Sequence, residues 1–99
     1  MYLIRDIMHC KPGHARPRVE KFKALTKVLK KMGFTSGHRV MTDLCAERYW
    51  TVVSEMEVKS LEEYTKMSRD TMNDKQMQKI MKDYHDLVLE GRREIYVIE

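Results

Sequence analysis

The chain has 99 residues, 42% hydrophobic and 34% charged, which predicts a single domain over residues 1–99 with a modest core that a partner subunit would extend. No apolar stretch approaches the roughly 20 residues of a membrane-spanning helix, and Arg5 and Asp6 stand where a signal peptide needs an apolar core. These features argue against a membrane span and predict a cytoplasmic location, where Cys10 and Cys45 stay reduced thiols.

The net charge of +4 is unevenly placed along the chain. Between residues 11 and 39, nine lysines and arginines, Arg18 among them, accompany the single acid Glu20. Such a basic segment either attracts nucleic acid, anionic lipid or an acidic protein, or it forms a solvated helix surface balanced elsewhere. The second interpretation needs fewer assumptions.

The first half of the chain predicts a strand and a helix. Residues 2–10 are rich in large apolar side chains and end at the Lys-Pro-Gly turn of residues 11–13, which is typical of a strand. From residue 15 to residue 32, apolar residues recur at helical spacing among lysines and arginines. Pro17 is tolerated in the first turn of this amphipathic helix, and Gly33 supplies its end.

The middle of the chain predicts a β-hairpin followed by a helix. Residues 38–44 alternate loosely, and residues 48–58 contain β-branched and aromatic side chains, so we expect two antiparallel strands joined by residues 45–47. Ser60 and Glu63 form a capping box, which opens a helix. The residues expected to be buried on this helix are Leu61, Tyr64 and Met67.

The last third predicts more helix and a final strand. The polar residues 70–74 interrupt the helical spacing, which resumes from Met77 to Val88, so we expect two helices or one bent helix. Gly91 is expected to end this region, and residues 93–99 to form a strand. The order β-α-β-β-α-β predicts an α+β, ferredoxin-like fold whose four-stranded antiparallel sheet is covered by helices on one face only.

Five segments stand out along the chain: KPG after the first strand, GF after the first helix, GHRVM, RYWTVVSEMEVKSLEEY and the closing GRREIYVIE. Together they resemble the dimeric α/β-barrel superfamily, which includes antibiotic-biosynthesis monooxygenase-like, heme-degrading and NIPSNAP-like domains. The resemblance implies a homodimer in which two open sheet faces pack about a twofold axis and close a barrel. It also implies a ligand pocket in each subunit, between the sheet and the helices.

Catalytic members of the superfamily typically have an asparagine on the first strand, a tryptophan late in the third strand and, for heme, a histidine on the second helix. The corresponding positions here hold Asp6, Met56, and Lys66 or Met67. Neither heme degradation nor the cofactor-free oxygenation typical of the superfamily is therefore implied by the resemblance, and we expect no cofactor.

Strand geometry assigns the candidate polar residues to faces. Period two places Asp6 and Met8 on one face of the first strand, and the resemblance turns that face, with Trp50 and Ser54 of the third strand, toward the helices. A buried carboxylate is costly without a partner, so Asp6 has either a structural partner or a ligand. On the opposite face, Arg5 and Glu55 pair with each other or across the dimer axis.

The histidines and cysteines form no convincing cluster. His9 and Cys10 point to opposite faces of a strand and His14 lies beyond the turn, so we expect no metal site. His38 and His85 have no evident acid or nucleophile partner in the sequence, and His85 lies either at the pocket or on an amphipathic surface.

Two functions remain open. The first is a homodimer that binds a small apolar or amphipathic molecule, fatty-acid-like or polyketide-like, in a pocket rich in methionine. Its candidate ligand-binding residues are Asp6, Met8, Phe22, Trp50, Ser54, Met56, Tyr64, Met67, Met81, Tyr84 and His85. The second is a cofactor-independent monooxygenase or isomerase with Asp6 or His85 as the general base. A nucleic-acid-binding module is less favoured, because RYWTVVSE lacks the glycine and alternating aromatics of RNA-recognition domains.

Overall fold

The computed structural model describes residues 1–33, 38–82 and 84–99, without the side chains of Tyr84 and His85. The elements in chain order are β1 (Tyr2–Cys10), α1 (Ala15–Lys31), β2 (Arg39–Thr42), β3 (Thr51–Val58), α2 (Leu61–Met72), α3 (Lys75–Ile80), α4 (Tyr84–Leu87) and β4 (Val88–Val97). This order confirms the predicted ferredoxin-like α+β fold.

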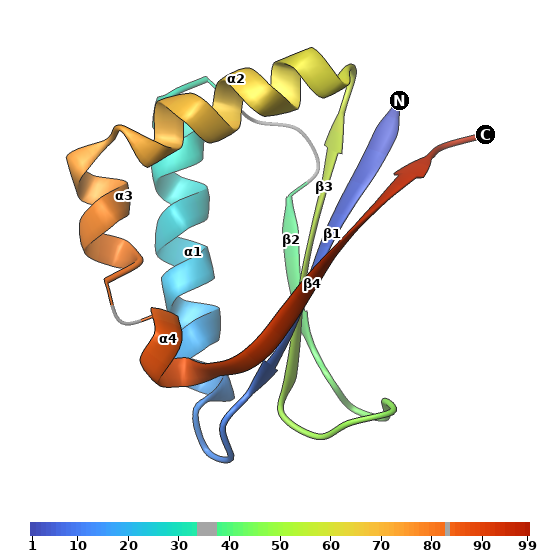
Figure 1. Ribbon diagram of the computed structural model, residues 1–99, viewed down its shortest axis with the longest axis vertical. Helices are drawn as coiled ribbons and strands as arrows, with labels where there is room; N and C mark the ends of the chain where they lie inside the picture. The colour runs from blue at the N-terminus through green and yellow to red at the C-terminus, as the bar shows by residue number, and fades with distance from the viewer. Residues whose placement is uncertain (34–37, 83) are drawn as a thin grey trace.

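The four strands form one antiparallel sheet in the order β2-β3-β1-β4. β1 lies in the middle, where Asp6 is opposite Ser54 of β3 on one side and Arg93 of β4 on the other. All four helices lie on the same side of the sheet (Figure 1). One face of the sheet is therefore covered by helices, as predicted, and no described helix covers the other, which we call the open face.

The boundaries of β1 and α1 agree with the prediction. The amide of Met32 donates to the carbonyl of Val28, and Gly33 follows with φ of +91°, a conformation that glycine adopts without steric cost. The apolar stripe of α1 packs on the sheet and supplies Val19 and Phe22 to the core. The other core residues are Met8, Cys10, Ala15, Val52, Leu87 and Val88.

The connection between β2 and β3 is longer than predicted. β3 begins at Thr51 rather than at residue 48, because Trp50 has φ of +60° and leaves the extended conformation. The carboxylate of Asp43 accepts a hydrogen bond from the amide of Thr51 at 2.8 Å, which closes the loop. Trp50 is 43% exposed, so its expected place in the alternation of β3 is wrong.

The capping box before α2 is confirmed. The amide of Glu63 donates to the hydroxyl of Ser60 at 3.1 Å, and the Glu63 carboxylate accepts from the amide of Lys59 at 3.2 Å. Leu61, which was expected to be buried, is 44% exposed, since the first turn of α2 follows directly on the end of β3 at the end of the sheet (Figure 1). The predicted interruption is confirmed where Asp74 caps α3.

The predicted helix end at Gly91 and strand start at residue 93 are wrong. β4 already begins at Val88, and Gly91 lies within it, opposite Met8 of β1. The amide of Lys11 donates to the carbonyl of Leu87 at 3.0 Å, so pairing with β1 starts as soon as α4 ends. The helical spacing up to Val88 reflects burial of that residue at the start of a strand.

The open face of the sheet contains a row of alternating charges. Arg39, Glu55, Arg5 and Glu94 are in register across the four strands. The Glu55 carboxylate is 3% exposed and lies 2.6 Å from an Nη2 atom of each arginine. Of the two expectations for Arg5 and Glu55, pairing within the chain is the one observed.

Candidate functional site

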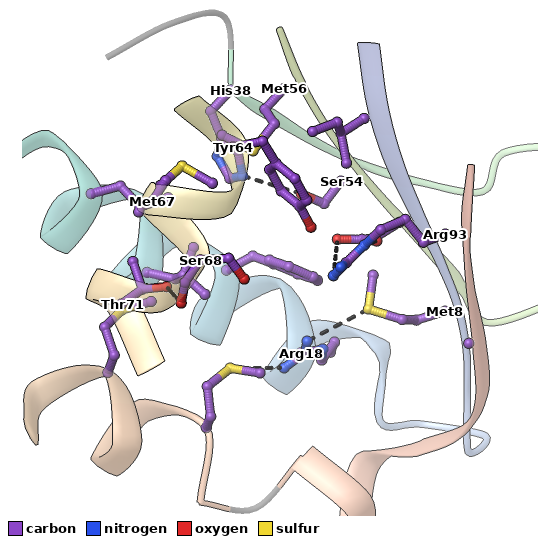
Figure 2. A pocket seen from close by; sticks show the side chains of 18 of the residues that line it. Met8, Arg18, His38, Ser54, Met56, Tyr64, Met67, Ser68, Thr71 and Arg93 are labelled. Carbon is purple, nitrogen blue, oxygen red and sulfur yellow. Dashed lines mark hydrogen bonds and ion pairs between the residues drawn. The ribbon is translucent and has the colours of Figure 1, made fainter. Parts of the chain in front are cut away.

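A cavity of about 680 Å³ lies between the sheet and the helices (Figure 2). By surface area, more of its wall is apolar than polar. The wall comes from β1, β3, α1, α2 and α3, and β4 closes one side. Its apolar lining residues are Ile4, Met8, Phe22, Leu25, Leu29, Met56, Met67, Met77 and Met81. Its other lining residues are Asp6, Arg18, His38, Ser54, Tyr64, Ser68, Thr71, Gly91, Arg92 and Arg93.

The structure brings eight of the predicted site residues together around this cavity. They are Asp6, Met8, Phe22, Ser54, Met56, Tyr64, Met67 and Met81. Trp50 does not line the cavity, because its backbone leaves the extended conformation before β3 begins. The side chains of Tyr84 and His85 lie outside the described part of the chain.

Asp6 is bound by Arg93, the residue opposite it on β4. Nε of Arg93 lies 2.7 Å from Oδ1 of Asp6, and Nη2 lies 3.4 Å from Oδ2. The Asp6 side chain is 30% exposed, so the carboxylate is half-buried rather than buried. A guanidinium that binds both carboxylate oxygens gives Asp6 a structural partner and makes it a poor candidate for a general base.

Tyr64 of α2 projects toward this ion pair (Figure 2). The guanidinium of Arg93 lies 5.5 Å from the centre of the Tyr64 ring, within the range of a cation–π contact. Burial raises the pKa of the Tyr64 hydroxyl, and the charge of Asp6 adds to this effect against the opposing charge of Arg93. The hydroxyl is therefore a neutral hydrogen-bonding group near the wall of the cavity.

His38 connects α1 to the centre of the sheet. Its Nδ1 lies 2.6 Å from Oγ1 of Thr26, and its Nε2 lies 3.1 Å from Oγ of Ser54. The Thr26 hydroxyl already donates to the carbonyl of Phe22, so we assign the Nδ1 proton to His38 and the Ser54 hydroxyl as donor to Nε2. Burial lowers the pKa of His38, against an opposing effect of Asp6, so the neutral ring fits this arrangement.

Arg18 of α1 is a buried cation on the wall of the cavity. It is only 2% exposed, and its guanidinium lies 4.2 Å from the centre of the Phe22 ring. Nη2 donates to the sulfur of Met8 at 3.5 Å, and Nη1 donates to the sulfur of Met81 at 3.9 Å. Counting Arg18 with a solvated helix surface is therefore wrong.

The position of Arg18 in the sequence indicates that it is buried, although the basic composition of its segment suggests a solvated surface. Arg18 lies three residues after Ala15 and four before Phe22, so it falls on the apolar stripe of α1. His38 was missed as a site residue for another reason, because its partners are 12 and 16 positions away in the chain. Only the packed fold brings His38, Thr26 and Ser54 together.

His9, His14 and Cys10 do not share a contact in the part of the chain that the structure describes. His9 contacts Thr51 on β3, His14 contacts the carbonyl of Pro12 in the turn, and Cys10 is buried in the core. Within the ranges that the structure describes, we find no three histidine, cysteine or acidic side chains close enough to hold a metal ion. Over the same ranges, no helix has the length and hydropathy needed to cross a membrane.

Comparison with known proteins relates the chain to others through its structure. No protein-family model and no curated protein matches it. An uncharacterized NIPSNAP domain protein from Burkholderia xenovorans superposes with a TM-score of 0.84 at 10% identity, covering 100% of this chain and 95% of that one. A NIPSNAP family protein from Agrobacterium tumefaciens gives 0.84 at 9% identity, covering 99% and 92%.

An antibiotic biosynthesis monooxygenase gives a TM-score of 0.74 at 8% identity, covering 100% of this chain and 99% of that one. Structural similarity at such low sequence identity establishes the fold alone. The activity has to be argued from the site. The resemblance seen in the sequence is confirmed at this level. The chain has the fold shared by NIPSNAP-domain and antibiotic-biosynthesis-monooxygenase-like proteins.

Proposed function

We propose that the protein is a homodimer in which each subunit binds one small apolar or amphipathic molecule, fatty-acid-like or polyketide-like, between the sheet and the helices. The single observation behind this proposal is the cavity of about 680 Å³. Its volume and its mostly apolar lining are typical of a site for a small organic molecule. The methionines of that lining adapt to irregular ligands, because their side chains are flexible and polarizable.

The open face of the sheet supports the homodimer. Helices cover the other face only, and alternation along β1 and β3 places Leu3, Ile7 and Val53 on the open face beside the charged row. A face with apolar residues and paired charges is suited to a twofold contact, in which each residue meets its equivalent patch. A cytoplasmic location remains a prediction from the sequence.

Binding is tested by isothermal titration calorimetry with a panel of fatty acids, fatty alcohols and aromatic acids, supported by native mass spectrometry. Met56→Trp fills the cavity from β3, and Leu44→Trp adds the same ring in the fully exposed loop between β2 and β3. We expect binding to the natural sequence and to Leu44→Trp, and at least tenfold weaker binding to Met56→Trp at an unchanged melting temperature. Failure of every compound on the panel to bind would contradict the proposal.

An enzyme of the same fold, a cofactor-independent oxygenase or isomerase, is the second candidate. The observation that favours it is the neutral imidazole of His38, whose ring is oriented by Thr26 and which contacts the Ser54 hydroxyl at the cavity wall. Because the Nε2 lone pair accepts from Ser54, this base acts through the Ser54 hydroxyl, whose oxygen takes the proton of an acidic C–H group of a bound molecule as its own proton passes to Nε2. In this second candidate function, His38 takes the role of general base that the sequence predicted for Asp6 or His85.

Exchange of ligand protons for deuterium in D₂O separates the two candidates. An enzyme that abstracts a proton accelerates this exchange, and His38→Gln should slow it by about 10²-fold or more. Binding without any acceleration by the natural sequence would leave a binding protein and exclude His38 as a base.

A further inference from the structure

The hydroxyl of Ser54 is a hydrogen-bond acceptor on the wall of the cavity. Ser54 is 5% exposed and lines the cavity from the middle of β3. It donates its proton to Nε2 of His38 at 3.1 Å, because the other ring nitrogen of His38 carries the imidazole proton. A hydroxyl group has one proton and two lone pairs, so Ser54 can still accept a hydrogen bond from a molecule in the cavity.

The protons of the side chains that hold Ser54 are already donated within the protein. The Thr26 hydroxyl donates to the carbonyl of Phe22 at 2.9 Å, and Nδ1 of His38 donates to the Thr26 hydroxyl at 2.6 Å. A neutral imidazole has a single N–H group, so none of these three polar side chains donates into the cavity. A ligand group that contacts Ser54 therefore has to bring the proton itself.

The residue beside Ser54 on the sheet is an acceptor as well. Asp6 is directly opposite Ser54, and an ionised carboxylate only accepts hydrogen bonds. Its charge is balanced by Arg93, whose Nε lies 2.7 Å from Oδ1. A carboxylate head group at Ser54 would lie next to the like charge of Asp6, and an ammonium head group would lie near the guanidinium of Arg93. A hydroxyl group brings a proton without a charge.

We propose that the molecule bound in the cavity is a neutral alcohol with an apolar body, whose hydroxyl donates to Ser54; this inference rests on the proposed ligand-binding function. His38 is then a positioning residue, which acts through the proton that it accepts from Ser54. Tyr64 projects from α2 toward the ion pair beside Ser54 (Figure 2), so its neutral hydroxyl can donate to the oxygen of the ligand. The apolar body of the ligand packs against the methionine-rich remainder of the wall.

The test compares a pair of isomers. 1-Decanol and 1-methoxynonane have the same atoms, but only the alcohol has an O–H group to donate. Both are titrated by calorimetry below their solubility limits, together with decanoate and decylammonium as charged counterparts. A cavity without the Ser54 contact would bind the ether at least as tightly as the alcohol, because burying a hydroxyl group without a partner is costly.

We expect the natural sequence to bind the alcohol about fivefold tighter than the ether or more, and about tenfold tighter than either charged compound. Ser54→Ala removes the acceptor, so the ratio of alcohol to ether affinity should fall to about one or below. His38→Phe frees the Ser54 proton, which can then be donated to the ether, so this ratio should fall as well. The matched control is Thr65→Val, which removes a hydroxyl group from the exposed side of α2 and should leave the ratio unchanged.

Equal affinity of the natural sequence for the alcohol and the ether would overturn the role of Ser54 and leave the cavity as a binding site. An unchanged ratio in Ser54→Ala would do the same. Binding of none of these compounds, or of any on the wider panel, would instead contradict the proposed function itself. If Ser54→Ala does not fold, the preference of the natural sequence between the isomers decides the question without it.

Discussion

The Nε2 atom of His38 lies 3.1 Å from the hydroxyl oxygen of Ser54, so a residue just before β2 is hydrogen-bonded to the centre of β3. The hydroxyl donates and the imidazole accepts, which requires the neutral ring. Protonation of His38 would place a second donor opposite Ser54 and a charge in a partly buried site. The stability of the fold is therefore linked to the protonation of this ring.

The free energy of unfolding should fall as the pH falls below about 6.5. Burial lowers the pKa of His38 from its ordinary value of 6.5, so the unfolded chain binds this proton more readily than the folded one. The loss should be no steeper than ~1.4 kcal/mol per pH unit from this group. Urea unfolding at about pH 7.5 and about pH 5.5 measures it. His38→Gln should flatten this slope, and the exposed-ring control His14→Gln should keep it.

Glu55→Gln should destabilise the fold by about 1–3 kcal/mol, because it weakens two charge-assisted hydrogen bonds. Burial by itself raises the pKa of Glu55, but the hydrogen bonds from Arg39 and Arg5 outweigh it and hold that pKa below the ordinary value of 4.5. The ionised form thus stabilises the fold above pH 4.5, and this contribution is lost as the pH falls through the lowered pKa.

Thermal and urea unfolding of Glu55→Gln test this expectation. The matched control is Glu20→Gln, because the Glu20 side chain is 59% exposed and its ion pair with Arg16 is 3.7 Å long. An exposed pair of this kind contributes at most ~1 kcal/mol. Equal effects of the two substitutions would contradict a special role for the buried carboxylate.

Val53→Lys should dissociate the proposed dimer. Val53 is opposite Ile7 of β1 and Met41 of β2, in the middle of the open face. An unpaired charge buried between two copies should weaken association by about 100-fold. Analytical ultracentrifugation measures the change, and Leu44→Lys in the exposed loop should leave association intact. A natural sequence that is monomeric at all concentrations would exclude the dimer directly.

Affinity should rise with the length of the ligand's apolar chain. Octanoate, decanoate and dodecanoate differ by two methylenes at each step, and each buried methylene contributes ~0.8 kcal/mol. Each step should therefore tighten binding by up to about 15-fold. Calorimetry on the three acids gives the series, which should stop earlier in Met56→Trp because its cavity is shorter. Affinities that do not vary with length would place the chain of the ligand in solvent.

Periodicity in the sequence predicted the parts of the site that lie on regular elements. The alternation placed Asp6 and Met8 on one face of β1 and Ser54 and Met56 on one face of β3, and the resemblance to the superfamily turned both faces toward the helices, where the structure has them. These assignments hold because a strand that pairs on both sides keeps its register. At Trp50 the backbone leaves the extended region, and the alternation ends with it.

Periodicity in the sequence could not predict the contacts that give the site its chemistry. Asp6 meets Arg93 because β4 pairs with β1 from Val88 onward, and that pairing overrides the helical spacing of the segment. Arg18 has the composition of a solvated face and the position of a core residue, and burial against Phe22 decides between them. Long-range pairing and packing, rather than local propensity, determine both.

β4 forms one edge of the sheet, and its ten residues include four charged side chains, those of Glu90, Arg92, Arg93 and Glu94. At the other edge, β2 has only four residues and begins with Arg39. Charged or short edge strands oppose the addition of further strands from other molecules. Concentrated solutions of this protein should therefore resist the formation of amyloid-like fibrils, even when its open face is in contact with a second copy.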